Sequence, residues 1–171
     1  MSDTTDLRKF YSHIKQKDLA RKHLWTINIT EDNVKENMIV YGVSSAWPAK
    51  AINPVEVPYL GFTYKVPGVV KFDETWKITV RDSTDFQLRK KLSGWVDAIY
   101  NSETGQANYI GKAFKEGTLF ALNPDLSASV EIIMEGMFPT SLGAVEYDYS
   151  SDGEVITYDV EFAYQRWYIK S

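Results

Sequence analysis

The chain has 171 residues, of which 44% are hydrophobic and 25% charged, with a formal net charge of −4 and no cysteine. This length is typical of one domain around one core. The absence of cysteine excludes a disulfide scaffold, thiol catalysis and cysteine-ligated metal centres. No apolar run approaches the roughly 18 residues of a membrane-spanning helix, and the charged start is unlike a signal peptide. We therefore expect a soluble intracellular protein without a membrane anchor.

Charge is distributed unevenly along the chain. Residues 117–171 carry nine acidic and two basic side chains, net −7, whereas residues 1–116 are net +3. An acidic surface repels phosphate, which argues against a nucleic-acid-binding face in the C-terminal third. The compact basic cluster at residues 89–91 is typical of a solvated helix face.

Residues 1–23 are predicted to form a polar, partly helical arm. Four apolar residues recur at i, i+3, i+4 and i+7, the spacing of a helical stripe: Leu7, Phe10, Tyr11 and Ile14. The rest of the arm is mostly polar or charged, so we expect it to stay ordered only when it docks on another surface.

Two strands are predicted after the arm. Residues 24–29 alternate, with Trp25, Ile27 and Ile29 on one face. A turn at residues 31–33 separates this strand from a second one, predicted over residues 37–45.

Prolines punctuate the next segment, residues 47–70. Proline cannot donate a hydrogen bond to a β-ladder, so we expect edge strand and loop here, and the dipeptide at 67–68 predicts a turn. Such a segment is suited to reach a neighbouring molecule. The candidate contact positions are Trp47, Pro48, Pro54, Pro58, Tyr59, Pro67 and Gly68.

A strand and the most regular helix of the chain are predicted next. Residues 75–80 alternate, with Trp76, Ile78 and Val80 directed inward. Residues 82–84 offer helix-capping side chains, and an apolar stripe then predicts an amphipathic helix over about 84–100. The stripe consists of Leu88, Leu92, Trp95, Val96 and Ile99.

The remainder is predicted to be mainly β. Residues 101–117 indicate a long loop or ragged hairpin, and strands at 118–122 and 127–134 flank a proline turn. Alternation of Val145, Tyr147 and Tyr149 predicts a further strand, joined through a hairpin turn at 150–153 to a last strand at 156–164.

No catalytic or metal site is indicated. The two histidines, His13 and His23, both lie in the arm, and no glycine-rich phosphate loop, H-E-x-x-H or G-x-S-x-G motif occurs. The chain is rich in aromatic residues, with five Trp, eleven Tyr and eight Phe, and aromatics are enriched at protein interfaces. We therefore expect a structural or binding protein without a cofactor, and no enzyme.

The order and spacing of several motifs carry a family resemblance. They run with few gaps from about Leu24 to Tyr168, and the arm and loop 101–117 match poorly. The motifs are Ser45-Ala46-Trp47-Pro48-Ala49, Val57-Pro58, Gly61-Phe62, Val66-Pro67-Gly68, Phe72–Val80, the helix with Trp95, Gly136-Met137-Phe138-Pro139-Thr140, Leu142-Gly143, Tyr147-Asp148-Tyr149 and Ser151–Glu154. In these the chain resembles the tail tube protein of T-even-like contractile phages, whose fold also occurs in the haemolysin-coregulated protein of type VI secretion.

The resemblance implies a fold and a role. The fold is mainly β, with two packed, partly barrel-like antiparallel sheets and one flanking helix; residues 24–171 form one tube domain after the arm. The role is structural, in hexameric rings stacked into a tube whose lumen conducts DNA. The implied partners are the chain itself, the tail sheath, the tape-measure protein, and the baseplate hub with its tube initiator. DNA is not bound specifically, and assembly takes place in the bacterial cytoplasm.

The resemblance also implies candidate positions for the passage of DNA through the lumen and for the contact between rings. An acidic lumen lets DNA slide without sticking, so we expect some of five carboxylates to face the lumen or the sheath: Glu146, Asp148, Glu154, Asp159 and Glu161. The proline-punctuated segment 47–70 is the candidate contact with the next ring.

Three other readings stay open. The chain could be the tube of a phage-derived injection system, or a baseplate tube initiator or terminator with the same fold. A β-barrel ligand-binding module or enzyme is the reading from a different class.

Overall fold

The structure is a computed structural model that describes residues 3–16, 18–31, 34–72, 75–151 and 153–170. The turn predicted at 31–33 therefore lies mostly outside the described residues. Within the described part, no helix is both long and apolar enough to cross a membrane.

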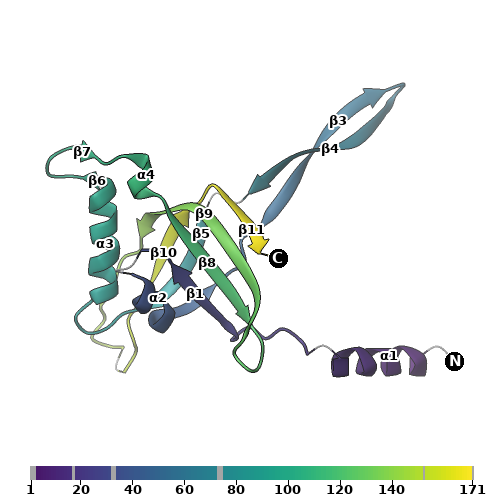
Figure 1. The fold of residues 1–171 in the computed structure, drawn as a ribbon, viewed down its shortest axis with the longest axis horizontal. Helices are drawn as coiled ribbons and strands as arrows, with labels where there is room; N and C mark the ends of the chain where they lie inside the picture. The colour runs from purple at the N-terminus through teal and green to yellow at the C-terminus, as the bar shows by residue number, and fades with distance from the viewer. Residues whose placement is uncertain (1–2, 17, 32–33, 73–74, 152, 171) are drawn as a thin grey trace.

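The predicted arm contains helix α1, Asp3–Gln16. It lies apart from the body of the protein, beyond an extended linker (Figure 1). The apolar stripe is uncovered, with Leu7, Phe10 and Tyr11 each more than half exposed. The helical prediction is confirmed, and the stripe has no packing partner in the body.

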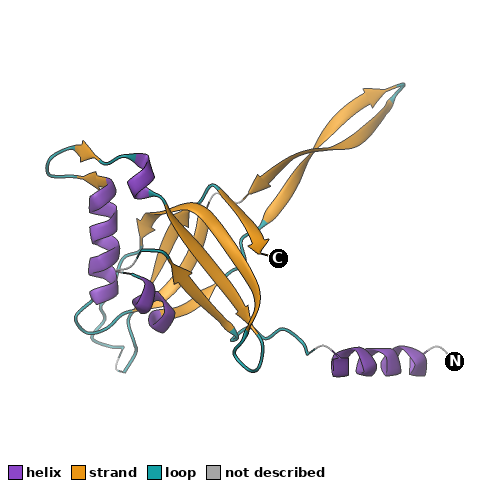
Figure 2. Ribbon diagram, viewed as in Figure 1, coloured by secondary structure: helices purple, strands orange, loops and turns teal. Residues whose placement is uncertain are grey.

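The body is one curled antiparallel sheet among the described residues, with strand order β1-β8-β9-β10-β5-β2 and β11 paired to β9 (Figure 2). Strand bounds are β1 Trp25–Ile29, β2 Gly42–Ser45, β5 Thr75–Arg81, β8 Lys115–Leu122, β9 Ala128–Leu142, β10 Thr157–Ala163 and β11 Arg166–Lys170. The mainly β class with a flanking helix is confirmed. The end strands β1 and β2 do not pair with each other, so the sheet does not close into a barrel.

Strand β9 joins the two halves of this sheet. Its first part pairs with β8 and β11, and its last part pairs with β10. Gly136 lies near the change of partner and has φ of +66°, a conformation that favours glycine and bends the strand. A single long strand, extending well past the predicted end at residue 134, thus serves both halves.

The core lies between the two halves and helix α3, Gln87–Ile99. Trp76 and Trp95 both pack against Phe162, with ring centroids 6.1 and 6.0 Å apart. The inward residues predicted on β5 are buried, as are three members of the helix stripe: Leu88, Leu92 and Trp95. On the strand predicted at 156–164, Ile156 is half-buried, and the other alternating residues are buried: Tyr158, Val160, Phe162 and Tyr164.

Asp82 ties the start of α3 to the sheet. Its carboxylate accepts hydrogen bonds from the backbone N–H of Arg89 at 2.9 Å and of Leu88 at 3.2 Å, and from the Tyr158 hydroxyl at 2.9 Å. Arg89 in turn donates to the Gly143 carbonyl at 2.7 Å and lies over the Tyr158 ring. Asp82 therefore has the predicted capping role, although it lies five residues before the first residue of α3, Gln87.

The strand predicted over residues 37–45 is wrong in its first part. Residues 35–41 form helix α2, Lys35–Tyr41, and only Gly42–Ser45 is strand. Val34 and Met38 are buried, a spacing of four that seats this short helix against β1. Packing overrides the β propensity of the local sequence.

Two further predictions need correction in the C-terminal half. The segment 101–117 contains a small hairpin, β6 Tyr100–Asn101 with β7 Gln106–Ala107, but also the unpredicted helix α4, Ile110–Ala113. The described residues between β9 and β10 contain no strand. The strand predicted at 145–149 is therefore wrong, and so is the tight hairpin at 150–153; Tyr147 and Tyr149 are exposed on a long connection.

Candidate assembly surfaces

A long two-stranded hairpin projects from the body (Figure 1). It consists of β3, Lys50–Tyr59, and β4, Phe62–Phe72, which within the described part of the chain pair only with each other. The turn is at Leu60 and Gly61, both with positive φ, as a two-residue type I′ connection requires. The turn predicted at Pro67-Gly68 is wrong, because both residues lie within β4. Most of the segment is strand, and within the described residues each of its two strands has one unpaired edge, as the edge-strand prediction expects.

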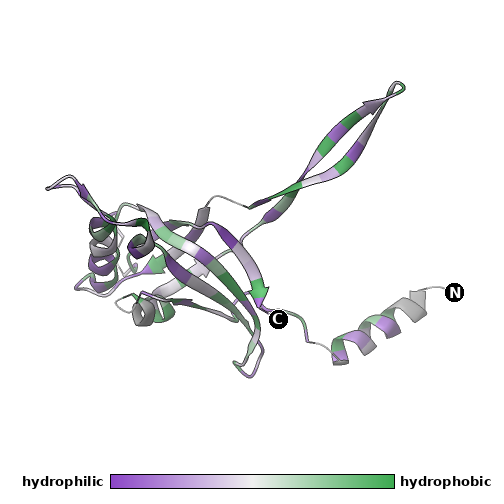
Figure 3. Cartoon of the chain, turned by 45° about the horizontal axis from the view of Figure 1, so that its top comes forward, coloured by the Kyte–Doolittle hydropathy of each residue, from purple (hydrophilic) through white to green (hydrophobic). Residues whose placement is uncertain are grey.

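The two faces of the hairpin differ in chemistry, because residues paired across the strands share a face. Three consecutive non-polar or aromatic pairs lie on one face: Val55 with Val66, Val57 with Tyr64, and Tyr59 with Phe62. We call these six residues the apolar ladder. All six are more than 40% exposed, and apolar and polar bands alternate along the hairpin (Figure 3).

The opposite face carries the prolines. Pro54 pairs with Pro67, Glu56 with Lys65, and Pro58 with Thr63. The Glu56–Lys65 ion pair spans 4.0 Å and is exposed, so its contribution to stability is small. Proline is tolerated because each strand of an isolated ribbon has one unpaired edge.

The candidate contact residues from the sequence are therefore divided. Tyr59 belongs to the apolar ladder, whereas the three hairpin prolines lie on the other face. Trp47 is 47% exposed, and Pro48 is buried at the base. In the sequence, apolar residues alternate with other residues on both sides of residues 60–61, and this pattern alone could have predicted the ladder.

Gly68 has a packing role instead of a turn role. It lies beside a register shift in the hairpin between Ile52 and Pro54. A Cβ at position 68 would lie 2.3 Å from the Asn53 carbonyl oxygen. Only glycine allows β3 and β4 to approach this closely.

The base of the hairpin is fastened to the last strand. The Trp167 indole N–H donates to the Ala49 carbonyl at 3.1 Å, and the Trp167 ring meets Phe72 edge to face, with centroids 6.5 Å apart. The Lys50 ammonium lies 5.6 Å from both ring centroids. Residues flanking both hairpin strands thus contact one tryptophan of β11, which fixes the direction of the projection.

The five acidic candidates fall into two separate groups. Asp159 and Glu161 are half-buried on the outward face of β10. Asp159 accepts hydrogen bonds from Lys77 and Thr79, both at 2.7 Å. The hydrogen bond from Lys77 is the main cause that lowers the pKa of Asp159, and the bond from Thr79 is the second. The ion pair between Lys77 and Asp159 also raises the pKa of Lys77. This face is therefore partly neutralised.

The other group lies on the exposed connection between β9 and β10, where Glu146, Asp148 and Glu154 border a shallow hollow. The backbone N–H and hydroxyl of Ser150 donate to Asp148 and lower the pKa of its carboxyl. The described residues hold no group of three or more His, Asp or Glu side chains placed to bind a metal ion.

Comparison with known proteins gives consistent matches along almost the whole chain. The family described as phage tail tube protein matches residues 9–170. The chain is 26% identical over 156 residues to the tail tube protein gp19 of Enterobacteria phage T4, covering 88% of this chain and 91% of that protein.

Solved structures share the fold at low sequence identity. A chain of the PVC sheath-tube complex, from an extracellular contractile injection system in its extended state, has a TM-score of 0.65 at 16% identity, covering 94% of this chain and 97% of that one. Hcp1 from Flavobacterium johnsoniae has a TM-score of 0.50 at 11% identity, covering 85% and 94%. The implied relation to the haemolysin-coregulated protein fold is confirmed.

Proposed function

Because the chain belongs to the phage tail tube protein family, we propose that it builds the inner tube of a contractile phage tail, as hexameric rings stacked around a lumen that conducts DNA. Membership of a structural family accords with the expectation that the chain is not an enzyme. The tube is a component of the virion tail.

The apolar ladder of the hairpin carries this proposal. Six exposed non-polar and aromatic side chains form one continuous face on a projection, and no part of the described chain covers them. Contiguous exposed apolar surface marks an interaction site. A projection that binds a different surface of an identical copy makes a heterologous contact, which closes into rings or continues as a filament. We propose that the ladder, rather than the proline face, contacts the next ring.

Two substitutions at neighbouring positions of the hairpin test this proposal. Val57→Asp places a charge in the ladder, and Thr63→Asp places the same charge on the proline face. Both sites are exposed, so both monomers are expected to fold with unchanged circular dichroism. Negative-stain microscopy should show tubes for wild type and Thr63→Asp, and no tubes for Val57→Asp. Normal tubes from Val57→Asp would contradict the contact, and an inert wild-type monomer at all concentrations would contradict the tube function.

We further propose that at least one acidic group faces the lumen or the sheath. The support is the excess of acidic residues in the C-terminal third and the outward position of both groups. Like charge between wall and phosphate removes the counterion-release term that drives DNA binding. A structure of the assembled tube in which all five carboxylates are distant from both surfaces would refute this idea.

The proposed partners are further copies of the chain, the tail sheath, the tape-measure protein, and the baseplate hub with its tube initiator. Support for a sheath partner comes from the shared fold of the PVC sheath-tube complex. Assembly is proposed to take place in the host cytoplasm, without membrane anchoring. Residues 24–171 are proposed to act as one tube domain, with residues 1–23 as an assembly arm.

The alternative is the tube, initiator or terminator of a phage-derived injection system. The observation that favours it is the similarity of fold to injection-system chains, which include a PVC sheath/tube terminator and a baseplate of the anti-feeding prophage. Neighbouring genes discriminate the two: capsid genes beside the gene support a phage tail, and their absence supports an injection system.

A further inference from the structure

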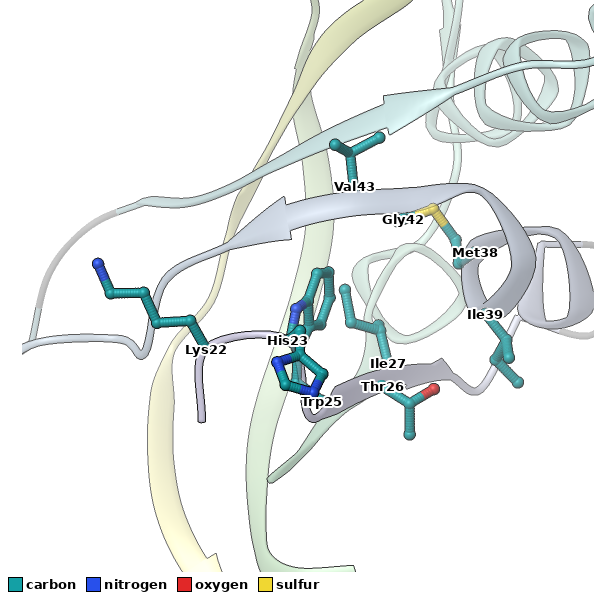
Figure 4. A pocket seen from close by; sticks show the side chains of 9 residues that line it. All are labelled: Lys22, His23, Trp25, Thr26, Ile27, Met38, Ile39, Gly42 and Val43. Atoms are coloured by element: carbon teal, nitrogen blue, oxygen red, sulfur yellow. The ribbon is translucent and has the colours of Figure 1, made fainter. Parts of the chain in front are cut away.

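The two unpaired ends of the curled sheet face each other across a seam. Among the described residues, strand β1 pairs only with β8, and β2 pairs only with β5. Figure 4 shows Trp25 and Ile27 of β1 in the space between these strands, with Gly42 and Val43 on the β2 side. A Cβ at position 42 would lie 3.4 Å from the Trp25 ring. Side-chain packing thus bridges the seam where backbone pairing is missing.

A groove of about 600 Å³ runs along this seam. We call it the seam groove. Its lining is mostly non-polar and comes from the linker, the start of β1, β2 and the residues after it, β8 and β9: Ala20, Arg21, Lys22, Leu24, Trp25, Val43, Ser44, Ser45, Trp47, Leu119, Phe120, Ala121 and Ile132. This volume lies in the range of sites that enclose large side chains or small ligands.

The same chain carries a helix whose apolar stripe is uncovered. Leu7, Phe10 and Tyr11 on α1 are 57%, 56% and 64% exposed. A helix of 14 residues is marginal in water without tertiary packing. Two aromatic side chains in tandem offer the large buried areas that dominate interface energies. The helix therefore needs an apolar surface, and the seam groove is an apolar surface that no described segment of this copy fills.

We propose that the α1 stripe of one copy packs in the seam groove of a neighbouring copy. The arm leaves the body at the groove, because residues 20–22 of its linker form one wall, and α1 lies away from its own body (Figure 1). A patch that complements a recess elsewhere on an identical chain gives a head-to-tail contact that closes into a ring or propagates. This inference rests on the proposed self-assembly and names a second pair of surfaces for it, distinct from the hairpin.

The cysteine-free sequence allows a direct test by disulfide trapping. Phe10→Cys, with a mass tag, is mixed with untagged Ser44→Cys from the groove and oxidised mildly under assembly conditions. Ser12→Cys, on the other side of α1, replaces Phe10→Cys as one control, and Ser93→Cys, exposed on α3, replaces Ser44→Cys as the other. The proposal expects the mixed dimer of the first pair to exceed both controls at least about tenfold on a non-reducing gel.

A single chain with both Phe10→Cys and Ser44→Cys shows whether the groove is filled by the arm of the same copy or by the arm of a neighbouring copy. Formation of an intrachain disulfide, without mixed dimers in the first experiment, would show that the arm fills its own groove and would overturn the proposal. Equal trapping of the test and control pairs would also overturn it. If tubes form in these mixtures without preferential trapping, the arm inference fails while the tube function stands. If wild type never assembles, the tube function itself fails.

Discussion

Replacing Asp82 by alanine should destabilise the monomer far more than its position in a loop suggests. The substitution removes the acceptor of the Tyr158 hydroxyl, which belongs to a residue only 3% exposed, and the acceptor of two backbone N–H groups at the start of α3. An orphaned buried hydroxyl costs about 1–3 kcal/mol, and a lost helix cap about 0.5–2 kcal/mol. We expect a loss of about 1.5–5 kcal/mol in the free energy of unfolding, which corresponds to a fall in Tm of roughly 3–20 °C.

Urea unfolding followed by circular dichroism and tryptophan fluorescence measures this loss, at concentrations where the chain is monomeric. A double-mutant cycle with Tyr158→Phe isolates the pair. Phenylalanine leaves no hydroxyl to satisfy, so Tyr158→Phe should cost less in the Asp82→Ala background than in wild type. Asp85→Ala is the matched control, because that carboxylate contacts only Ser83 and Gln87 near the surface. Strict additivity of the cycle, or an equal loss from Asp85→Ala, would refute the reasoning.

Three further outcomes are expected. Leu92→Ala, at a fully buried site of α3, should lower the free energy of unfolding by about 2–5 kcal/mol in the same urea assay; a change below about 1 kcal/mol would mean that the core packs differently. Gly68→Ala should force β4 away from the Asn53 carbonyl and raise amide hydrogen exchange across the hairpin, without lowering the Tm of the body. Gly94→Ala is the control, because the space around that position is open, and it should leave exchange in the hairpin unchanged. Burial of the Tyr158 hydroxyl, and after it the hydrogen bond to Asp82, raises the pKa of Tyr158 well above 10. Above about pH 10 the native state keeps a proton that the unfolded chain releases, so the free energy of unfolding should fall as the pH rises. Tyr158→Phe should flatten this fall in the same urea assay.

The sequence predicted best where one face of an element is buried. The alternation of Trp76, Ile78 and Val80 reports burial directly, because their strand packs one face on the core. The stripe of α3 does the same with a helical period. Periodicity of this kind follows from the boundary between core and solvent, so it is visible without knowledge of the partners.

Prediction failed where the environment was not encoded in the local pattern. Alternation at Tyr147 and Tyr149 resembles a strand, but among the described residues no strand pairs with these two positions, and both side chains are exposed. Met38 lies in a run of good strand formers that is nevertheless helical, because packing against β1 decides its conformation.

The hairpin was missed for a different reason. The prolines indicate edge strand and loop, but they do not reveal that Pro54 and Pro67 lie opposite each other in a regular two-stranded ribbon. The ladder on the other face could have been found from the alternation around residues 60–61. The seam groove had no comparable signal, since its walls come from three distant parts of the chain.

The strand order also determines when the protein can fold during synthesis. β1 pairs with β8, and β5 pairs with β10, so the body depends on contacts between residues far apart in the sequence, such as Thr79 with Asp159, which are 80 residues apart. Such non-local pairing is slow because loop closure precedes any gain from contact. The β3–β4 pairing of the hairpin, by contrast, is local and can form while the ribosome still holds the last strands. A nascent chain would therefore present the exposed apolar ladder of the hairpin before the body exists, and transiently exposed apolar surface of this kind favours aggregation.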